Sequence, residues 1–295
     1  MLEALLPYLD MPQYTLADLP VIGKLKLQVF GPLVAVGVIL GMNRVLAYAK
    51  AKDMDEYICR DLMFWVLVFG FTISHWVSVI FYFPQDVIDN PWLLLMIWNG
   101  LSSVGGFFGA LVGVVWYLKK KKQPLLVYID ALVYGFVVGF TFGRLGCSLV
   151  HDHPGALIDQ LPTWLQWLAV GPWPDGQFRL DLGLLEFVYD VGIIALVYLV
   201  YNWKKDRRPG HLTGLVCMLY APYRFILDFM REQDVRYFGL TTAHYATIAL
   251  FAIGVYLIFV RKERPEDRMW ARDSDRIAAE KAALAAQAEA KAKAT

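Results

Sequence analysis

Seven long apolar stretches constrain the fold of this chain more than any other feature of its sequence. A helix needs roughly 20 mostly apolar residues to cross a hydrocarbon core of about 30 Å. The stretches that reach this length are 27–49, 62–83, 92–118, 125–150, 182–201, 212–230 and 240–260. Apolar residues make up 58% of the chain, too many for a water-soluble surface. The sequence therefore predicts an all-α integral membrane protein with about seven transmembrane helices.

The connecting segments alternate in lysine and arginine content, a bias that usually sets orientation. Basic residues gather after the first, third, fifth and last stretches, for example at 119–122 and 204–208. The other connections hold mainly acids. We therefore expect the amino terminus in the periplasm and the carboxyl terminus in the cytoplasm.

Composition divides the chain into three parts. We expect a periplasmic interfacial segment at 1–26, a seven-helix domain at 27–261 and a charged, alanine-rich cytoplasmic tail at 262–295. The tail favours helix but has too little apolar surface to build a core. Within the helical domain, tryptophans among leucines and prolines at 151–181 are suited to the headgroup layer and predict an outer interfacial cap.

Charge and cysteine content exclude two other classes. The net charge of +1 gives no basic field that would attract nucleic acid, so we expect no nucleic-acid partner. Two of the three cysteines, Cys147 and Cys217, lie in apolar stretches without a neighbour at disulfide spacing. We expect free thiols.

Glycine recurs at every fourth position in the third and fourth stretches. The glycines are Gly105, Gly109 and Gly113, then Gly135, Gly139 and Gly143. Glycines at this spacing remove side chains from one stripe of a helix and let another backbone approach closely. We expect close helix packing that gives a rigid frame.

Several ionisable residues interrupt the apolar stretches, where each ionised group costs at least about 2.5 to 3.5 kcal/mol. They are Arg144, Glu186, Asp190, Arg224 and Asp228, with Tyr220 on the same helical stripe as the last two and Arg231 just beyond. One interpretation is that Arg224 and Asp228 neutralise each other and lock helices together. The other is that two arginines beside lipid bind an anionic headgroup, because a guanidinium fork fits a phosphate.

Histidines could carry a metal site or proton transfer. His151-Asp152-His153 follows the fourth stretch and offers either a metal site or a general base. Structural zinc sites need four ligands, so we expect no metal here. A thiol substrate would need a base, which keeps proton transfer open. His75 and His244 lie alone in apolar runs and are interpreted as packed, satisfied side chains.

Ordered motifs in this chain resemble those of the bacterial prolipoprotein diacylglyceryl transferases. Gly143-Arg144-Leu145-Gly146 is similar to the core of the family signature, and Leu184-Leu185-Glu186 to the end of its His-Pro-x-Gln-Leu-Tyr-Glu motif. Residues 208–214 and 220–234 resemble the region of the family's second essential arginine, and 240–244 resemble its Leu-Thr-Met-Gly-Gln. The resemblance covers most of the chain.

This resemblance implies a multi-pass enzyme of the bacterial inner membrane. It would move the diacylglyceryl group of phosphatidylglycerol to the lipobox cysteine thiol in the signal peptide of a preprolipoprotein, forming a thioether and releasing glycerol phosphate. We expect Arg144 and Arg224 to hold the phosphate, and Glu186 and Asp228 to orient the arginines. The other expected substrate-binding residues are Tyr220, Arg231, Gly143 and Gly146. No cofactor is expected.

Three departures from the family pattern are visible in the sequence. Val104 stands where the family has a histidine in Ser-Phe-His-Gly-Gly, Cys147 replaces an asparagine, and Val150-His151-Asp152 replaces Asn-Gly-Glu. The family's proposed general base is therefore missing from its position. His151 or His153 could accept the proton instead, with Asp152 near the missing glutamate.

Two alternatives remain open. A divergent homologue could bind anionic phospholipid or lipoprotein precursors without transferring the group. A small-solute transporter would line a pathway with its buried charges, but it would show repeat symmetry and charges near the midplane. Convergence of Arg144, Arg224 and Glu186 on one lipid-accessible outer cavity would favour the enzyme, and scattered charges, each neutralised within its own helix pair, would favour a scaffold.

Overall fold

The computed structural model describes residues 6–19, 23–96, 100–201, 207–231 and 236–264, and most of the predicted tail at 262–295 lies outside them. The chain divides into two compact units. The first comprises Met1–Asn43, Val133–Trp203 and Leu212–Val260, and the second comprises Arg44–Leu132, Lys204–His211 and Arg261–Thr295.

Six helices in the described ranges are long and apolar enough to cross a membrane. They are α1 (Phe30–Ala51), α2 (Glu56–Tyr82), α5 (Leu125–Val150), α6 (Leu182–Ala195), α7 (His211–Phe229) and α8 (Thr242–Val255), with α6 and α8 continued by the π-helical turns η4 (Leu196–Val200) and η5 (Tyr256–Val260). The chain is thus a mostly helical, multi-pass membrane protein, as its hydropathy predicts.

The predicted span 92–118 is wrong at its start. Its first part is a short helix α3 (Pro84–Asp89) followed by the 3-10 turn η1 (Pro91–Leu95), and the long helix α4 begins only at Ser103 and ends at Lys120. Gly100 between them has a left-handed φ of +84°, which cannot continue a right-handed helix. With 18 residues and two lysines in its last turn, α4 is shorter in apolar length than the other spans.

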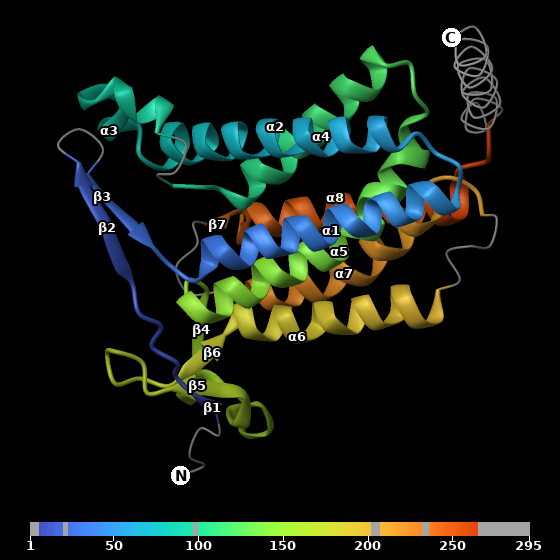
Figure 1. The fold of residues 1–295 in the computed structure, drawn as a ribbon. Helices are drawn as coiled ribbons and strands as arrows, with labels where there is room; N and C mark the ends of the chain where they lie inside the picture. Colours follow the sequence, from blue (N-terminus) through green and yellow to red (C-terminus); the bar gives the residue numbers. More distant parts are fainter. Residues whose placement is uncertain (1–5, 20–22, 97–99, 202–206, 232–235, 265–295) are drawn as a thin grey trace, which may run out of the picture. The chain divides into compact units, whose positions relative to one another are not determined.

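Within the second unit, the first glycine ladder packs α4 against α2 (Figure 1). A Cβ on Gly109 would lie 2.4 Å from the Phe69 carbonyl oxygen, so only glycine permits this approach. The Tyr117 hydroxyl donates to Asp61 Oδ2 at 3.0 Å and ties the same two helices together. His75 is fully buried, with its ring nitrogens 3.1 Å from the Gly100 carbonyl and 2.8 Å from that of Leu93, which confirms the satisfied side chain that was predicted.

The second ladder serves the first unit, where it brings α5 against α1. A Cβ on Gly37 would lie 2.8 Å from the Gly139 carbonyl oxygen, and one on Gly41 would lie 3.0 Å from that of Gly135. Each ladder therefore fixes one helix pair within its own unit. In the first unit, the pair provides the frame on which Arg144 is carried.

The segments outside the helices of the first unit contain strands that hydropathy did not predict. A four-stranded sheet has the order β1-β5-β6-β4, from β1 (Leu6–Pro7), β5 (Ala169–Gly171), β6 (Arg179–Asp181) and β4 (Pro154–Leu157) (Figure 1). Two further pairs are β2 (Tyr14–Leu19) with β3 (Gly23–Leu27), and β7 (Arg236–Tyr237) with β8 (Leu240–Thr241). The sheet joins the amino-terminal segment to the predicted cap.

The cap packs against the start of α6 and the end of α7. Its 3-10 turns are η2 (Ile158–Gln160) and η3 (Thr163–Leu168). Leu161 and Leu180 of the cap are buried in one apolar cluster with Leu182 of α6 and Leu227 of α7. Trp164 on η3 is 72% exposed, the character expected of a side chain at a membrane interface. This packing fixes the start of α6, where the candidate site begins.

We expect Gly109→Ala to destabilise the protein by about 1–3 kcal/mol, because the added methyl group would collide with the α2 backbone. Gly192→Ala is the matched control, since a Cβ there in α6 meets nothing within 4 Å. Thermal unfolding in detergent measures both variants. Equal midpoints would show that the glycine contact does not limit the packing of α2 and α4.

Candidate functional site

One buried carboxylate, that of Glu186, joins Arg144 and Arg224. Glu186 Oε1 lies 3.1 Å from Arg144 Nε, and Oε2 lies 3.0 Å from Arg224 Nη1. Glu186 is on α6, whose start is capped by Asp181 through a bond from the Leu184 N–H at 3.0 Å. Three helices, α5, α6 and α7, therefore meet at one side chain.

Asp228 extends the network to α8. Its Oδ1 accepts from Arg224 Nη2 at 2.9 Å, one helical turn away on α7, and its Oδ2 accepts from the Thr241 hydroxyl. Thr241 is the N-cap of α8 and also accepts from the His244 N–H at 3.3 Å. The cap that starts α8 therefore also fixes the carboxylate that holds Arg224.

Aromatic groups complete the surroundings of the two arginines. The Tyr220 hydroxyl donates to Glu186 Oε1. The Arg144 guanidinium lies over the Phe140 ring at 4.9 Å from its centroid, a cation–π contact. The edge of Tyr220 meets the same ring. These contacts limit the directions in which Arg144 can move.

The network is closed, in the sense that its four charged side chains are buried, and its charges balance. Arg144 and Arg224 are each 6% exposed, and Glu186 and Asp228 are fully buried. Two guanidinium charges thus face two carboxylates, which satisfies the demand for pairing in a medium of low dielectric constant. Arg144 and Arg224 both contact Glu186, and Arg224 also makes the predicted pair with Asp228. A phosphate that enters would compete with Glu186 and Asp228 for the guanidinium groups.

Arg144 retains a donor for such a ligand. Although its Nε is close to Glu186, the N–H has no hydrogen-bond partner among the described residues. A buried donor without an acceptor is costly, so an added acceptor that aligns with it would be stabilising.

The remaining predicted lipid-binding residues lie around this network. Gly146 packs against Phe30 of α1, where a Cβ would approach a ring carbon to 2.8 Å, whereas Gly143 has open space within 4 Å. Arg231 follows α7, and its backbone forms a bridge with Gly155 in the cap. The structure places Arg231 at the junction of α7 and the cap.

Two buried side chains near the network, those of Asp190 and His244, had no role at the site assigned from the sequence. Asp190, one turn beyond Glu186 on α6, is 3% exposed, and its Oδ2 has no hydrogen-bond partner in the described part of the chain. His244 is buried as predicted, and its Nδ1 accepts from the Thr241 N–H at 3.1 Å, but its Nε2 has no partner among the described residues. The signal for the Thr241 cap was present, because a threonine three residues before a hydrogen-bonding side chain is a capping-box pattern.

His151 anchors the amino-terminal segment. A left-handed φ of 53° at His151 ends α5 and turns the chain. Its Nδ1 lies 2.6 Å from Asp181 Oδ2, its Nε2 lies 3.2 Å from the Leu9 carbonyl, and the Tyr8 ring stacks on it at 4.0 Å. Burial lowers the pKa of His151, but the hydrogen bond and charge of Asp181, with the Leu9 carbonyl, outweigh burial and raise it above 6.5.

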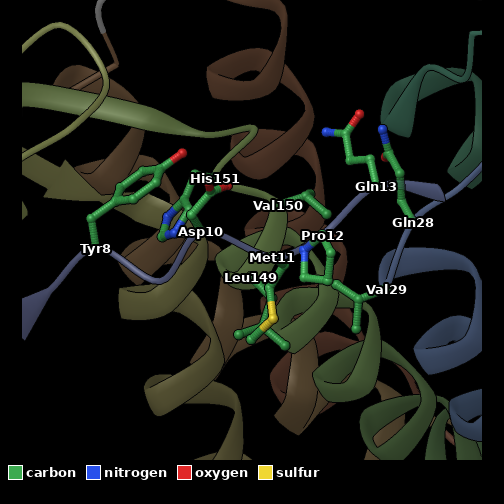
Figure 2. A pocket seen from close by; sticks show the side chains of 10 residues that line it. All are labelled: Tyr8, Asp10, Met11, Pro12, Gln13, Gln28, Val29, Leu149, Val150 and His151. Carbon is green, nitrogen blue, oxygen red and sulfur yellow. The ribbon is translucent and has the colours of Figure 1, made fainter.

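A small pocket lies next to this anchor (Figure 2). Tyr8, Asp10 and Met11 line it from the amino-terminal segment, and Leu149 and His151 from the end of α5. Its cavity volume of about 40 Å³ is far below the ~300 Å³ of a small-molecule site. The pocket therefore suits ordered water rather than a lipid headgroup.

His153 points to the arginine network instead. Its Nε2 lies 3.2 Å from Arg144 Nη1, and its Nδ1 is bonded to Asp152 Oδ1. The Cys147 thiol completes a group in which one ligand atom from each of Cys147, Asp152 and His153 lies within 4.8 Å of the others. Three such groups are fewer than the four of a structural zinc site.

Comparison with known proteins gives a consistent family match. A family model described as prolipoprotein diacylglyceryl transferase matches residues 19–260. A phosphatidylglycerol–prolipoprotein diacylglyceryl transferase of Polynucleobacter asymbioticus is 29% identical over 70% of this chain and 77% of its own length. The protein of the same name from Staphylococcus saprophyticus is 27% identical over 82% and 87%. A Clostridium perfringens relative is 23% identical over 81% and 92%.

We expect Glu186→Gln to lower the free energy of unfolding by about 3–5 kcal/mol, because two buried guanidinium groups would lose their shared charge partner. Asp190→Asn, one turn away, should change stability little or raise it, since its Oδ2 has no partner to lose. Denaturant titration in mixed micelles measures both. A smaller loss for Glu186→Gln than for Asp190→Asn would contradict the assigned network.

The anchor at His151 should weaken as pH rises. Because the folded-state pKa is raised, its contribution to stability is complete below the unfolded value of 6.5 and is lost as pH passes through the higher folded value. The Tyr8 amide, bonded to the Gly171 carbonyl at 3.4 Å, should then exchange hydrogen faster than its intrinsic rate increase explains. The Trp173 amide, bonded to Gln177, is the internal control. If His151→Gln kept the same extra pH dependence, another group would be responsible.

Proposed function

The chain belongs to the prolipoprotein diacylglyceryl transferase family, and from this premise we propose that it transfers the diacylglyceryl group of phosphatidylglycerol to the lipobox cysteine of a prolipoprotein. The reaction forms a thioether and releases glycerol phosphate. The observation that carries the proposal is the sharing of Glu186 by Arg144 and Arg224, which brings two phosphate-binding groups together inside a membrane protein. The relatives carry this activity in their names.

The proposed roles follow from charge. A phosphodiester carries one negative charge, and the departing glycerol phosphate gains a second as its bond to carbon breaks. Guanidinium groups already held in place stabilise that developing charge without reorganising at the moment of reaction. Glu186 and Asp228 position the arginines, and Tyr220 holds Glu186 by its hydrogen bond. Lipid binding would shift Glu186 contacts to the phosphate.

The proposed setting is the bacterial inner membrane, with the site toward the periplasm. Arg144, Glu186 and Asp228 all lie near those ends of their helices that meet the cap. In the sequence, the basic segments at 119–122 and 204–208 adjoin the opposite ends of α5, α6 and α7. Segments rich in lysine and arginine stay in the cytoplasm. A preprolipoprotein signal peptide would then reach the site from the periplasmic leaflet.

One observation supports the alternative of lipid binding without transfer. Both arginines are already neutralised in the closed network, and Val104 occupies the position of the family histidine. A divergent member with this arrangement would bind an anionic phospholipid and leave the thiol unmodified. The two candidate functions differ in whether a thioether forms.

We expect Arg144→Gln and Arg224→Gln each to reduce thioether formation by about 10²–10³-fold or more, because each removes a charge from the leaving phosphate. The assay incubates the purified full chain with phosphatidylglycerol and a lipobox peptide, and follows peptide mass and glycerol phosphate. Arg179→Gln is the control, since this arginine bonds to Asp175 in the cap and not to the network.

Three outcomes separate the candidates. Thioether formation that depends on both arginines supports transfer. Phosphatidylglycerol binding without product supports the alternative. Activity that survives either substitution at near-normal rate removes that arginine from the mechanism.

A further inference from the structure

We propose that His153, oriented by Asp152, accepts the proton of the attacking thiol. The proposal rests on the transferase function proposed above and adds its proton acceptor. The observation behind it is a chain of three side chains, Asp152, His153 and Arg144, that links a carboxylate through an imidazole to the arginine network. His153 is 8% exposed and Arg144 is 6% exposed, whereas the Asp152 side chain is 46% exposed, so the three side chains lead from the protein surface to the buried network.

The partners of His153 define its tautomer. A guanidinium has only donors, so His153 Nε2, at 3.2 Å from Arg144 Nη1, must accept with a lone pair. The ring proton therefore resides on Nδ1, which donates to the Asp152 carboxylate. A carboxylate bonded to Nδ1–H fixes the ring and stabilises the imidazolium that forms when Nε2 takes a proton. This is the arrangement of a general base with its orienting acid.

His151 has the opposite arrangement. Both of its ring nitrogens face acceptors, the Asp181 carboxylate and the Leu9 carbonyl. These contacts engage both nitrogens outside the arginine network. Of the two histidines that flank Asp152, only His153 presents a basic nitrogen to the site.

His153 Nε2 also lies where it could reach the attacking thiol. In the proposed complex the lipid phosphate lies on Arg144 at a hydrogen-bond distance of about 2.8 Å. The carbon that is attacked is one bond from that phosphate, and a thiol approaching it comes within reach of a group beside Arg144 Nη1. When Arg144 turns to the phosphate, His153 Nε2 loses its donor and becomes available for the thiol proton.

The step balances without a co-reactant. The sulfur electron pair forms the bond to the glyceryl carbon, and the electron pair of the breaking carbon–oxygen bond leaves with the phosphate. The thiol proton moves to His153 Nε2 and from there to the released phosphate or to water. No group is oxidised or reduced.

The groups that face His153 also bear on a metal site. They are Arg144 from α5, Asp152 beside it and the Cys147 thiol one helical turn before the end of α5. A metal on Nδ1 would force the ring proton to Nε2, where it would face the donor-only Arg144. It would also place a second cation beside the guanidinium. The hydrogen bond from Arg144 therefore favours the base over the metal.

The test compares the wild-type protein with His153→Gln across pH values from about 5.5 to about 9, a range that includes the ordinary pKa of imidazole and of a thiol. Glutamine can still accept from Arg144 but cannot take a proton. We expect a loss of about 10²–10⁴-fold near neutral pH, which shrinks as the peptide thiol ionises by itself above about pH 8.5. Asp152→Asn should show a weaker loss of the same form.

Two comparisons identify the role of His153. Arg224→Lys should lower activity by a similar factor at every pH, because Arg224 is proposed to hold the phosphate and its ion pairs are with Glu186 and Asp228. His151→Gln should keep the acidic limb of the pH–rate profile. Nitrogen NMR of selectively labelled histidine checks the tautomer independently of activity, with an unprotonated Nε2 and a protonated Nδ1 expected for His153.

Several results would overturn the proposal. A His153→Gln defect that is constant with pH would make His153 a structural residue, while the transferase function would stand. Absence of thioether from the wild-type protein would remove both the function and its base. A metal that copurifies in stoichiometric amount and is lost in Cys147→Ser would replace the base with a metal site.

Discussion

Two guanidinium groups share one buried carboxylate in this protein, and the arrangement of four helices depends on the network around that contact. A charged side chain in the hydrocarbon region must be paired, because lipid chains cannot solvate a charge and water is excluded there. Glu186 meets Arg144 from α5 and Arg224 from α7, and Asp228 continues the chain of contacts to the cap of α8. Displacement of α5, α6 or α7 would separate buried charges that pair with one another, and displacement of α8 would remove the hydroxyl donor of Asp228.

The same contacts that stabilise the fold also poise the site for an anion. The charges cancel in the closed state, so the network is stable without a ligand, yet each guanidinium can exchange a carboxylate oxygen for a phosphate oxygen of similar geometry. Arg144 Nε, close to Glu186 but not hydrogen-bonded to it, is the donor that gains most from such an exchange. Stability and binding therefore use the same side chains.

The loop after α5 shows how neighbouring residues of one type acquire different chemistry. His151 and His153 are two positions apart, but the left-handed backbone at His151 turns them toward different partners. Two acceptors surround His151 and favour its charged form as an anchor for the amino-terminal segment. A carboxylate and a guanidinium surround His153, and its Nε2 lone pair faces Arg144.

The sequence by itself determined that this protein lies in a membrane, the approximate position of most helices, and the identity of its buried charges. These are local properties, since hydropathy over about 20 residues and the cost of a charge in lipid need no knowledge of distant partners. The family motifs connected three of these charges, Arg144, Glu186 and Arg224, with one expected site. Local patterns also had limits, because the break between α3 and α4 depends on the backbone at Gly100 and was missed.

Only the tertiary structure decided which groups pair. Glu186 and Arg224 are 38 positions apart, and His151 and Leu9 are 142 apart, so no spacing rule could connect them. The cap sheet was likewise hidden, because its two- to four-residue strands are too short for an alternating pattern and are defined by their partners. The roles of the two histidines depend on which donor or acceptor faces each ring nitrogen, and folding alone supplies that.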